Sequence, residues 1–217
     1  MPVFARAVIG VCAAAAAVLA ACSGDDDAHR TAPQRMDLVN LVSDSSGTCR
    51  TMVLDSGDTL ALSRELDGYD SDTVTRCMVV YVARNTTPRP TAVIYSMGEP
   101  VTTWIKNYAT VRFDTVKVVA AWIGGGCINL RLKVDDYGGA HYFGFAWLGW
   151  SHNPDSTRVA CMALYHSARS YSGFYNRDAT VCCPLSQLLP TLRQGTDSVA
   201  LLTNDAGKGP SWHRMPY

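Results

Sequence analysis

The sequence contains few charged residues and no excess of either sign. Lysine and arginine together number 19, aspartate and glutamate also number 19, and charged residues make up 18% of the chain. Proteins that bind DNA or RNA hold the phosphates with clustered lysine and arginine side chains. A neutral chain with so little charge is therefore predicted not to bind nucleic acid.

Three further absences narrow the range of folds and activities. No long stretch repeats its apolar residues at the 3.6-residue period of an amphipathic helix. No H-E-x-x-H, G-x-S-x-G or C-x-x-C-H motif occurs, which are local patterns of zinc proteases, serine hydrolases and haem attachment. Beyond the N-terminus no apolar run reaches the roughly 20 residues that span a bilayer. We therefore expect an all-β protein that is not an enzyme and holds no cofactor or metal.

The first 21 residues have the three parts of a secretory signal peptide. Arg6 supplies the positive charge, residues 7–20 are apolar, and two small alanines precede Cys22. Residues 19–22, Leu-Ala-Ala-Cys, form a lipobox, so Cys22 is predicted to carry a diacylglycerol and a further acyl chain such as palmitate. Two or more chains would anchor the protein stably in a membrane. The alternative is a soluble export signal followed by an ordinary cysteine.

Residues 22–36 follow as a polar segment without apolar periodicity, which predicts a flexible acidic tether. Asp25, Asp26 and Asp27 fit two interpretations equally well. One is the acidic signal with which some Gram-negative anaerobes send lipoproteins to the cell surface, and the other is a merely solvated tether. The predicted location is the outer membrane, with the protein facing either the cell surface or the periplasm.

Six cysteines remain once Cys12, in the signal peptide, and Cys22 are set aside. Outside the cytoplasm an even number favours disulfides, and the lack of C-x-x-C or nearby H-x-x-x-H spacings disfavours zinc. Adjacent Cys182 and Cys183 would point to opposite faces of a strand and so have different partners. One candidate bridge joins Cys49 to Cys77, and a cross-strand bridge could form at Cys127. The disulfide candidates are Cys49, Cys77, Cys127, Cys161, Cys182 and Cys183.

Short apolar runs separated by turn residues cover the rest of the chain. Residues 127–134 alternate cleanly between apolar and polar side chains, which predicts a strand with one buried and one wet face. Strands of this length and spacing favour a barrel or a sandwich. We expect a loop at residues 167–177 and a helical turn within residues 181–189. The expected strands are residues 37–42, 49–54, 58–63, 75–83, 91–95, 115–122, 127–134, 141–148, 158–166 and, last, 197–203.

Several of these segments together resemble one family. Residues 53–60 form a first hairpin, and residues 117–134 form a second hairpin around three glycines. Three further segments follow in order: His141 with Phe143, then Leu164–Ser167, then Asp197–Leu201. In this order they resemble NigD-like bacterial lipoproteins, over most of residues 37–205.

The resemblance implies an OB-like β-barrel domain at residues 37–110 and a β-sandwich domain at residues 111–217. It also implies a role in bacteriocin immunity as one version of the function, because the family takes its name from a bacteriocin gene cluster. The six cysteines depart from the pattern of the family, so the disulfides are expected to be particular to this branch.

Four histidines and two aromatic segments are the candidates for specific chemistry. His141, His152, His166 and His213 could be bases or ligands, but surface or hydrogen-bonded structural roles are favoured.

Phe143, Phe145 and Trp147 share strand parity, which favours a core face over a sugar-binding platform. Tyr171, Phe174 and Tyr175 lie in the expected loop and are the candidates for a partner-binding loop, because exposed tyrosines at a loop tip suit recognition.

The sequence supports three functions, in decreasing order. The first is a non-enzymatic lipoprotein of the cell envelope that binds a protein or glycan partner, with bacteriocin immunity as one version. The second is a structural or accessory subunit of an outer-membrane complex. The third is an extracytoplasmic hydrolase whose catalytic residues meet only in the fold.

Overall fold

The computed structural model describes residues 32–136, 139–168, 175–187 and 191–217. The only helical element in these residues is one 3-10 turn, η2 (Leu185–Gln187), and all other regular structure is β-strand. The all-β fold class is therefore confirmed. Cys22 and the predicted signal peptide lie outside the described residues. Residues 34–217 form one unit by their contacts.

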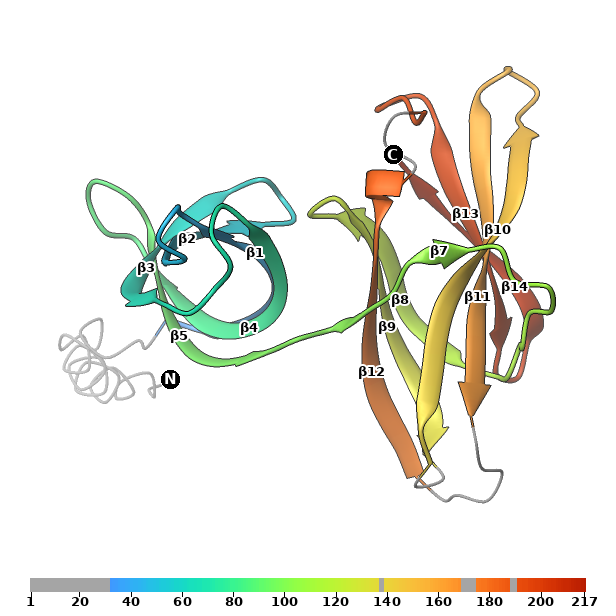
Figure 1. Ribbon diagram of the computed structural model, residues 1–217, viewed down its shortest axis with the longest axis horizontal. Helices are drawn as coiled ribbons and strands as arrows, with labels where there is room; N and C mark the ends of the chain where they lie inside the picture. The colour runs from blue at the N-terminus through green and yellow to red at the C-terminus, as the bar shows by residue number, and fades with distance from the viewer. Residues whose placement is uncertain (1–31, 137–138, 169–174, 188–190) are drawn as a thin grey trace, which may run out of the picture. The chain divides into compact units, whose positions relative to one another are not determined.

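The first five strands close into a small barrel, in the order β1-β2-β3-β5-β4, as Figure 1 shows. Closure depends on a short parallel pairing of β3 with β5, while the other neighbouring strands are antiparallel. The predicted barrel is confirmed, and every strand in it has two neighbours. The strands are β1 (Gln34–Ser43), β2 (Cys49–Leu54), β3 (Thr59–Leu66), β4 (Val74–Arg84) and β5 (Thr91–Gly98).

The barrel interior is filled by alternate residues of its strands. Leu41, Met52, Val79 and Tyr81 are completely buried there. The Tyr81 hydroxyl donates a hydrogen bond of 2.9 Å to the Asp37 carboxylate, which satisfies the phenol at the edge of the apolar core. This small core holds the barrel strands at fixed positions for the site described below.

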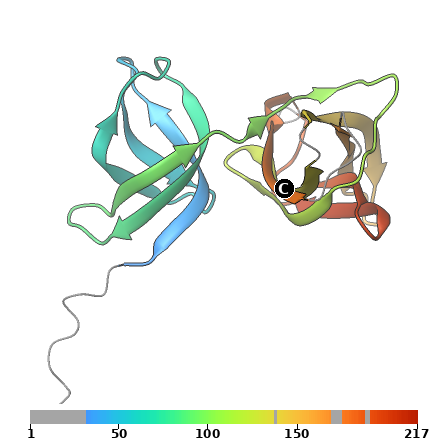
Figure 2. The same ribbon diagram turned by 90° about the horizontal axis from the view of Figure 1, so that it is seen from below.

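The following strands form a sandwich of two sheets, which face each other in Figure 2. One sheet has the order β14-β13-β11-β10-β7 and the other has the order β6-β12-β9-β8. The predicted sandwich is confirmed. The strands are β6 (Val101–Thr102), β7 (Ile105–Lys106), β8 (Lys117–Gly124), β9 (Cys127–Asp136), β10 (His141–His152), β11 (Arg158–Ala168), β12 (Tyr175–Pro184), β13 (Ser198–Asp205) and β14 (Gly209–Pro216).

The sandwich core lies between the inner faces of the two sheets. The apolar face expected for β9 is confirmed, because its alternate residues are all buried in this core. Phe145 of β10 is completely buried opposite them, and Phe143 and Trp147 pack against the same core. The core interpretation of this aromatic stretch is therefore also confirmed. The buried β9 residues are Ile128, Leu130, Leu132 and Val134.

Three expectations about the strands were wrong. Strand β12 begins at Tyr175 inside the expected loop, because ten residues from Tyr175 to Pro184 pair with β9. The last strand is β14, which forms a hairpin with β13, although its glycine and prolines weaken the strand pattern. Residues 129–133 of β9 do not have a fully wet outer face, because Asn129 is completely buried against the barrel.

Within the described residues, no helix is long enough and apolar enough to cross a membrane.

Candidate functional site

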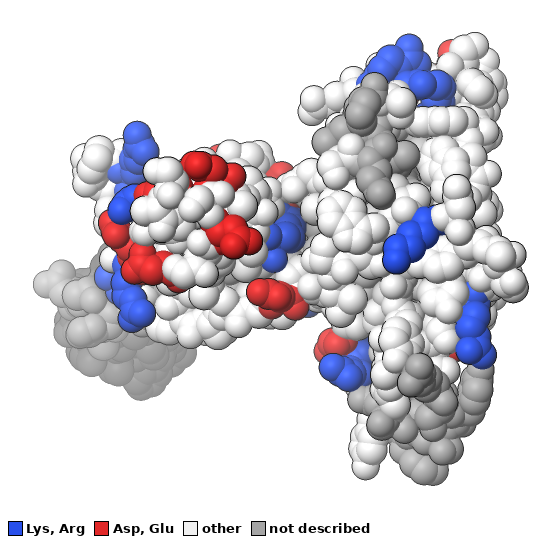
Figure 3. All heavy atoms as spheres, in the orientation of Figure 1, with Lys and Arg blue, Asp and Glu red and all other residues white. Residues whose placement is uncertain are grey.

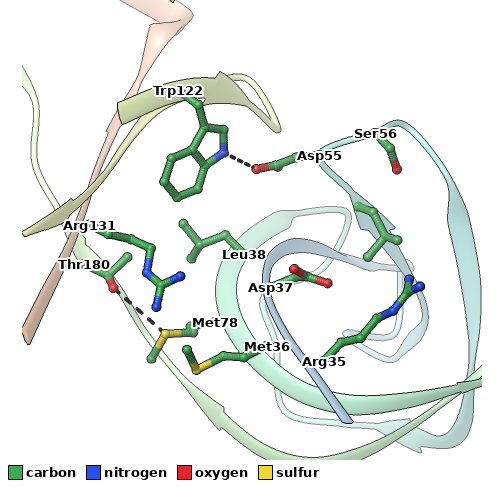
Figure 4. Close-up of a pocket in the computed structure, with 11 residues that line it drawn as sticks. Arg35, Met36, Asp37, Leu38, Asp55, Ser56, Met78, Trp122, Arg131 and Thr180 are labelled. Atoms are coloured by element: carbon green, nitrogen blue, oxygen red, sulfur yellow. Dashed lines mark hydrogen bonds between the residues drawn. The ribbon is translucent and has the colours of Figure 1, made fainter. Parts of the chain in front are cut away.

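A polar cluster around Asp55 joins the barrel to the sandwich. Asp55 follows β2, and its Oδ1 lies 2.6 Å from Nη2 of Arg76 on β4. The indole Nε1 of Trp122 on β8 donates a 2.6 Å hydrogen bond to the other carboxylate oxygen, as Figure 4 shows. The Arg76 side chain is only 7% exposed, so this ion pair is largely removed from solvent. Breaking such a pair costs far more than breaking an exposed one.

Two asparagines extend the cluster on either side of Arg76. The guanidinium donates to Oδ1 of Asn40 at 3.1 Å and to Oδ1 of Asn129 at 3.2 Å. The amide of Asn40 in turn donates to the carbonyl oxygen of Gly125 at 3.1 Å, and that of Asn129 to the carbonyl oxygen of Gly124 at 3.0 Å. Each side-chain amide therefore accepts a hydrogen bond through its oxygen and donates one through its nitrogen. Together they hold the turn at Gly124 and Gly125 against the barrel.

The glycines of this turn are required by close approach. A Cβ on Gly124 would lie 2.5 Å from the carboxyl carbon of Asp55, and a Cβ on Gly125 would lie 2.1 Å from Nη1 of Arg76. Gly125 also has a φ of +59°, in the left-handed region that favours glycine. The turn was expected from the sequence, but its contact with the barrel was not.

A pocket of about 380 Å³ opens beside the cluster, between the barrel and the sandwich. This volume lies within the usual range for ligand sites of about 300–1,000 Å³. Figure 4 shows Met78 near the Thr180 hydroxyl and the Arg131 guanidinium. The lining residues come from both parts of the chain: Arg35, Met36, Asp37, Leu38, Leu54, Asp55, Ser56 and Met78 from the barrel, and Trp122, Arg131 and Thr180 from the sandwich.

Two arginines line this pocket, Arg35 from the barrel and Arg131 from the sandwich, and the groove described below shares only Arg131. The Arg131 side chain is exposed, and within the described part of the chain it forms no ion pair. Met36 and Met78 beside it are flexible and polarisable, so they can adapt to different apolar groups. The pocket thus offers the positive charges of two arginines in adaptable apolar surroundings.

A larger groove of about 690 Å³ continues from this pocket. The two share four lining residues, and the groove then follows β12 toward the start of β10. On the face shown in Figure 3, acidic side chains gather over the barrel, while much of the sandwich surface carries no charge. We call the pocket and the groove together the crevice. The shared residues are Met36, Met78, Arg131 and Thr180.

Two of the four candidate histidines meet at the far end of the crevice. Nδ1 of His141 lies 3.1 Å from Nε2 of His166, with the rings within 5° of parallel. Nδ1 of His166 lies 3.2 Å from the carbonyl oxygen of Asp114. Because a carbonyl can only accept, His166 carries its proton on Nδ1, and its Nε2 accepts from His141. Burial lowers the pKa of His166, which favours its neutral form.

The other two histidines lie elsewhere. His213 on β14 lies 3.0 Å from the Thr203 hydroxyl, and His152 is at the opposite end of β10 from His141. The described residues also contain no group of three or more His, Cys, Asp or Glu side chains arranged to hold a metal. The structural interpretation of the histidines therefore fits the contacts of His166 and His213.

All six candidate cysteines are free thiols in the structure. Cys183 packs in the sandwich core and Cys182 on the opposite face of β12, where its thiol donates to Oδ1 of Asn129 at 3.2 Å. Burial raises the pKa of Cys77 to about 11 and that of Cys182 and Cys183 to about 12. The predicted bridges are thus not formed here, and the pairing of Cys49, Cys77, Cys127, Cys161, Cys182 and Cys183 stays a prediction.

The predicted partner loop is only partly within the structure. Tyr171 and Phe174 lie outside the described residues. Tyr175 is 77% exposed and begins β12, so it is a strand residue next to the crevice and not part of a loop.

Neither a family model nor a curated protein sequence matches the chain. Solved structures do match. A NigD-like immunity protein from Bacteroides caccae superposes with a TM-score of 0.63 and 24% identity, over 82% of this chain and 91% of that one. A lipoprotein candidate from Bacteroides fragilis superposes with a TM-score of 0.63 and 11% identity, over 85% and 98%.

A toxin-related candidate from Parabacteroides distasonis matches with a TM-score of 0.62 and 17% identity, over 85% of this chain and 93% of that one. None of these three descriptions names an enzyme. Over most of its length, the chain has the fold of the NigD-like immunity protein and of the Bacteroides lipoprotein candidate.

Proposed function

We propose that this chain is a lipid-anchored, non-enzymatic protein of the cell envelope that binds a protein partner. The lipobox that ends at Cys22 supports the anchor, and the shared fold with a lipoprotein candidate agrees with it. The shared fold with an immunity protein favours a protein as the partner. Immunity to a bacteriocin is one version of this function.

One observation carries the binding role, which is the crevice between barrel and sandwich. Its pocket and groove are continuous, both parts of the chain line it, and Arg131 in it forms no ion pair among the described residues. The polar cluster around Asp55 and Arg76 holds its two walls together. A wall that is fixed before binding loses little conformational freedom when a partner arrives.

The anchor is tested by metabolic labelling with a clickable fatty acid, followed by separation of membranes. Cys22→Ser should abolish the label and release the protein or leave it unprocessed. Cys161→Ser, which changes a partly exposed cysteine of β11, is the matched control and should keep both label and membrane location. A labelled, membrane-bound Cys22→Ser protein would contradict the anchor.

The binding role is tested by photo-crosslinking in cells of the natural host. A photoreactive residue replaces Met36, which lines the crevice and is 47% exposed, and in a second variant Met97 of β5, which is 44% exposed and lines neither part of the crevice. We expect one defined protein adduct from position 36 and none from position 97. Equal adducts from both positions, or none from position 36, would contradict the proposal.

A further inference from the structure

The groove runs along an edge of β12 that the rest of the described chain leaves unpaired. On one side β12 pairs with β9 over all ten of its residues. On its other side it pairs with β6 at only two positions, Val181 with Val101 and Cys182 with Thr102. Natural proteins usually cover or shorten such an edge, because its unpaired backbone groups can bind another strand.

The backbone groups that point outward can be identified from the pairing. The carbonyl oxygen of Cys182 accepts a 2.9 Å hydrogen bond from the amide of Thr103, so Cys182 directs its backbone groups away from β9. Successive residues of a strand alternate in this direction. The amides and carbonyls of Thr180, Asp178 and Asn176 therefore point to the same edge. The Val181–Val101 pairing uses the carbonyl of Thr180, and no described strand pairs with the amide of Thr180 or with the backbone groups of Asp178 and Asn176.

The chain does not itself extend β6 along this edge. Strand β6 begins at Val101, and the described residues before it form no pair with Thr180 or Asp178. The chain there runs on from β5 of the barrel, which ends at Gly98. Among the described residues, the edge from Asn176 to the amide of Thr180 therefore remains available for a strand from outside.

We propose that a partner of this protein binds as an extended peptide that adds a strand to the β12 edge, in continuation of β6. This proposal rests on the partner-binding role proposed above and adds that the partner binds as an extended strand. Main-chain hydrogen bonds supply affinity in strand addition, and pockets for alternate side chains supply specificity. The groove provides such pockets on both faces of the added strand.

The inner face of the added strand is apolar. Ala179 of β12 and Val134 of β9 face the inside of the sandwich, and Phe143 of β10 lies across from them in the lining of the groove. Every second side chain of the bound peptide would enter this space. We therefore expect apolar residues at alternate positions of the peptide.

The outer face of the added strand carries a positive charge. Arg131 stands opposite Thr180 in the β9–β12 register, so it shares the outer face of the sheet with that small residue. Lys133 on the same face is already paired with Asp178 at 3.0 Å, whereas Arg131 forms no ion pair among the described residues. We expect acidic side chains at the remaining positions of the peptide, within reach of Arg131.

The test uses the mature protein and a fluorescent peptide of alternating valine and glutamate. Fluorescence anisotropy should show binding to the natural sequence and to Asp178→Ala, which keeps the backbone amide. Asp178→Pro removes an outward-pointing amide without touching the pairing with β9, and should weaken binding by about tenfold. Unchanged binding by Asp178→Pro, or no binding of the peptide by the natural sequence, would overturn the proposal.

Residue-resolved hydrogen exchange keeps the test independent of any folding defect in the variants. The amides of Asn176, Asp178 and Thr180 should exchange quickly in the free protein and slowly with bound peptide. Those of Arg177 and Ala179, which already face β9, should be protected in both states. Protection of the first three without peptide, rising with protein concentration, would show that a second copy of the chain covers the edge and would overturn the proposal. If a protein adduct forms at position 36 in cells but the peptide does not bind, strand addition at β12 is wrong and the partner-binding role still stands.

Discussion

The barrel and the sandwich are both built from β-strands, but they differ in what they leave unpaired. The barrel closes on itself, and each of its strands has two neighbours. In the sandwich, β10 and β12 each have one long neighbour and one neighbour that pairs at two positions only. The barrel also has one such short pairing, between β3 and β5, but neither of these strands lines the crevice, whereas the groove follows the edge of β12. In the crevice the barrel therefore offers side chains, and the sandwich also offers backbone groups.

This difference assigns the two parts separate roles in the crevice. The barrel contributes the adaptable Met36 and Met78 and one half of the polar cluster. The sandwich contributes Arg131 and the edge of β12. Variants of each part can show whether the barrel and the sandwich unfold separately and how much the polar cluster between them stabilises the fold.

The largest effects should come from emptying either core. Phe145→Ala should destabilise the sandwich by about 3–5 kcal/mol, and Leu41→Ala the barrel by about 2–5 kcal/mol. All five tryptophans lie in the sequence after the barrel strands, and of these Trp122 contacts the barrel at Asp55. In a Trp122→Phe background, tryptophan fluorescence therefore follows the sandwich, while far-UV circular dichroism follows both parts. If Leu41→Ala moved the fluorescence transition as far as the circular dichroism transition, the two parts would unfold as one.

Removing Asp55 should loosen the join between the two parts. Asp55→Ala leaves the buried Arg76 without its carboxylate and Trp122 without its acceptor. We expect a loss of about 3 kcal/mol of unfolding free energy, measured by denaturant titration. Arg50→Ala, which removes two ion pairs on the exposed barrel surface, is the control and should have a much smaller effect. Equal losses would show that the cluster does not stabilise the fold.

Smaller losses are expected in the glycine turn. Gly125→Ala should cost about 1–3 kcal/mol, because the new Cβ meets Arg76 and the backbone has a positive φ. Gly126→Ala adds a Cβ with no atom within 4 Å, so only the strain of its φ of +76° remains, about 1 kcal/mol. Thermal unfolding of the two variants compares them directly, and a Gly126→Ala cost as large as that of Gly125→Ala would contradict the close approach.

The smallest effect should be a pH dependence from His166 in the sandwich. Burial lowers its pKa in the folded state, so below the unfolded-state pKa of about 6.5 the unfolded chain binds the proton more readily. Unfolding free energy should therefore fall as the pH drops below about 6.5 and stay level above it. Measurements kept above about pH 5 avoid most titration of carboxylates. His166→Gln should flatten this slope, and an unchanged slope would contradict the assignment.

Local patterns were enough to predict most of the strands. Residues 127–134 alternate so regularly that their buried face could be assigned in advance. Strand β14 was missed, because Gly209, Pro210 and Pro216 hide a hairpin that its pairing with β13 stabilises. Strand pairs this far from ideal sequence depend on tertiary contacts rather than on local preference.

The crevice could not be predicted in the same way. Asn40, Asp55, Arg76 and Asn129 each look like ordinary turn or strand residues, and the hydrogen bond from Asn40 reaches Gly125, 85 positions away. No local pattern marks Arg76 as a buried residue with an ion-pair partner. The lipobox is a purely local pattern, and the anchor at Cys22 stays a prediction that labelling can test.

The central claim is that a partner binds in the crevice, and one measurement tests it most directly. Once the adduct at position 36 identifies the partner, its affinity is measured by calorimetry for the natural sequence, Arg131→Ala and Arg89→Ala. Arg89 is an exposed arginine between β4 and β5 that lines neither part of the crevice. The account predicts binding weaker by about tenfold for Arg131→Ala and unchanged for Arg89→Ala. Equal affinities for both variants would contradict it.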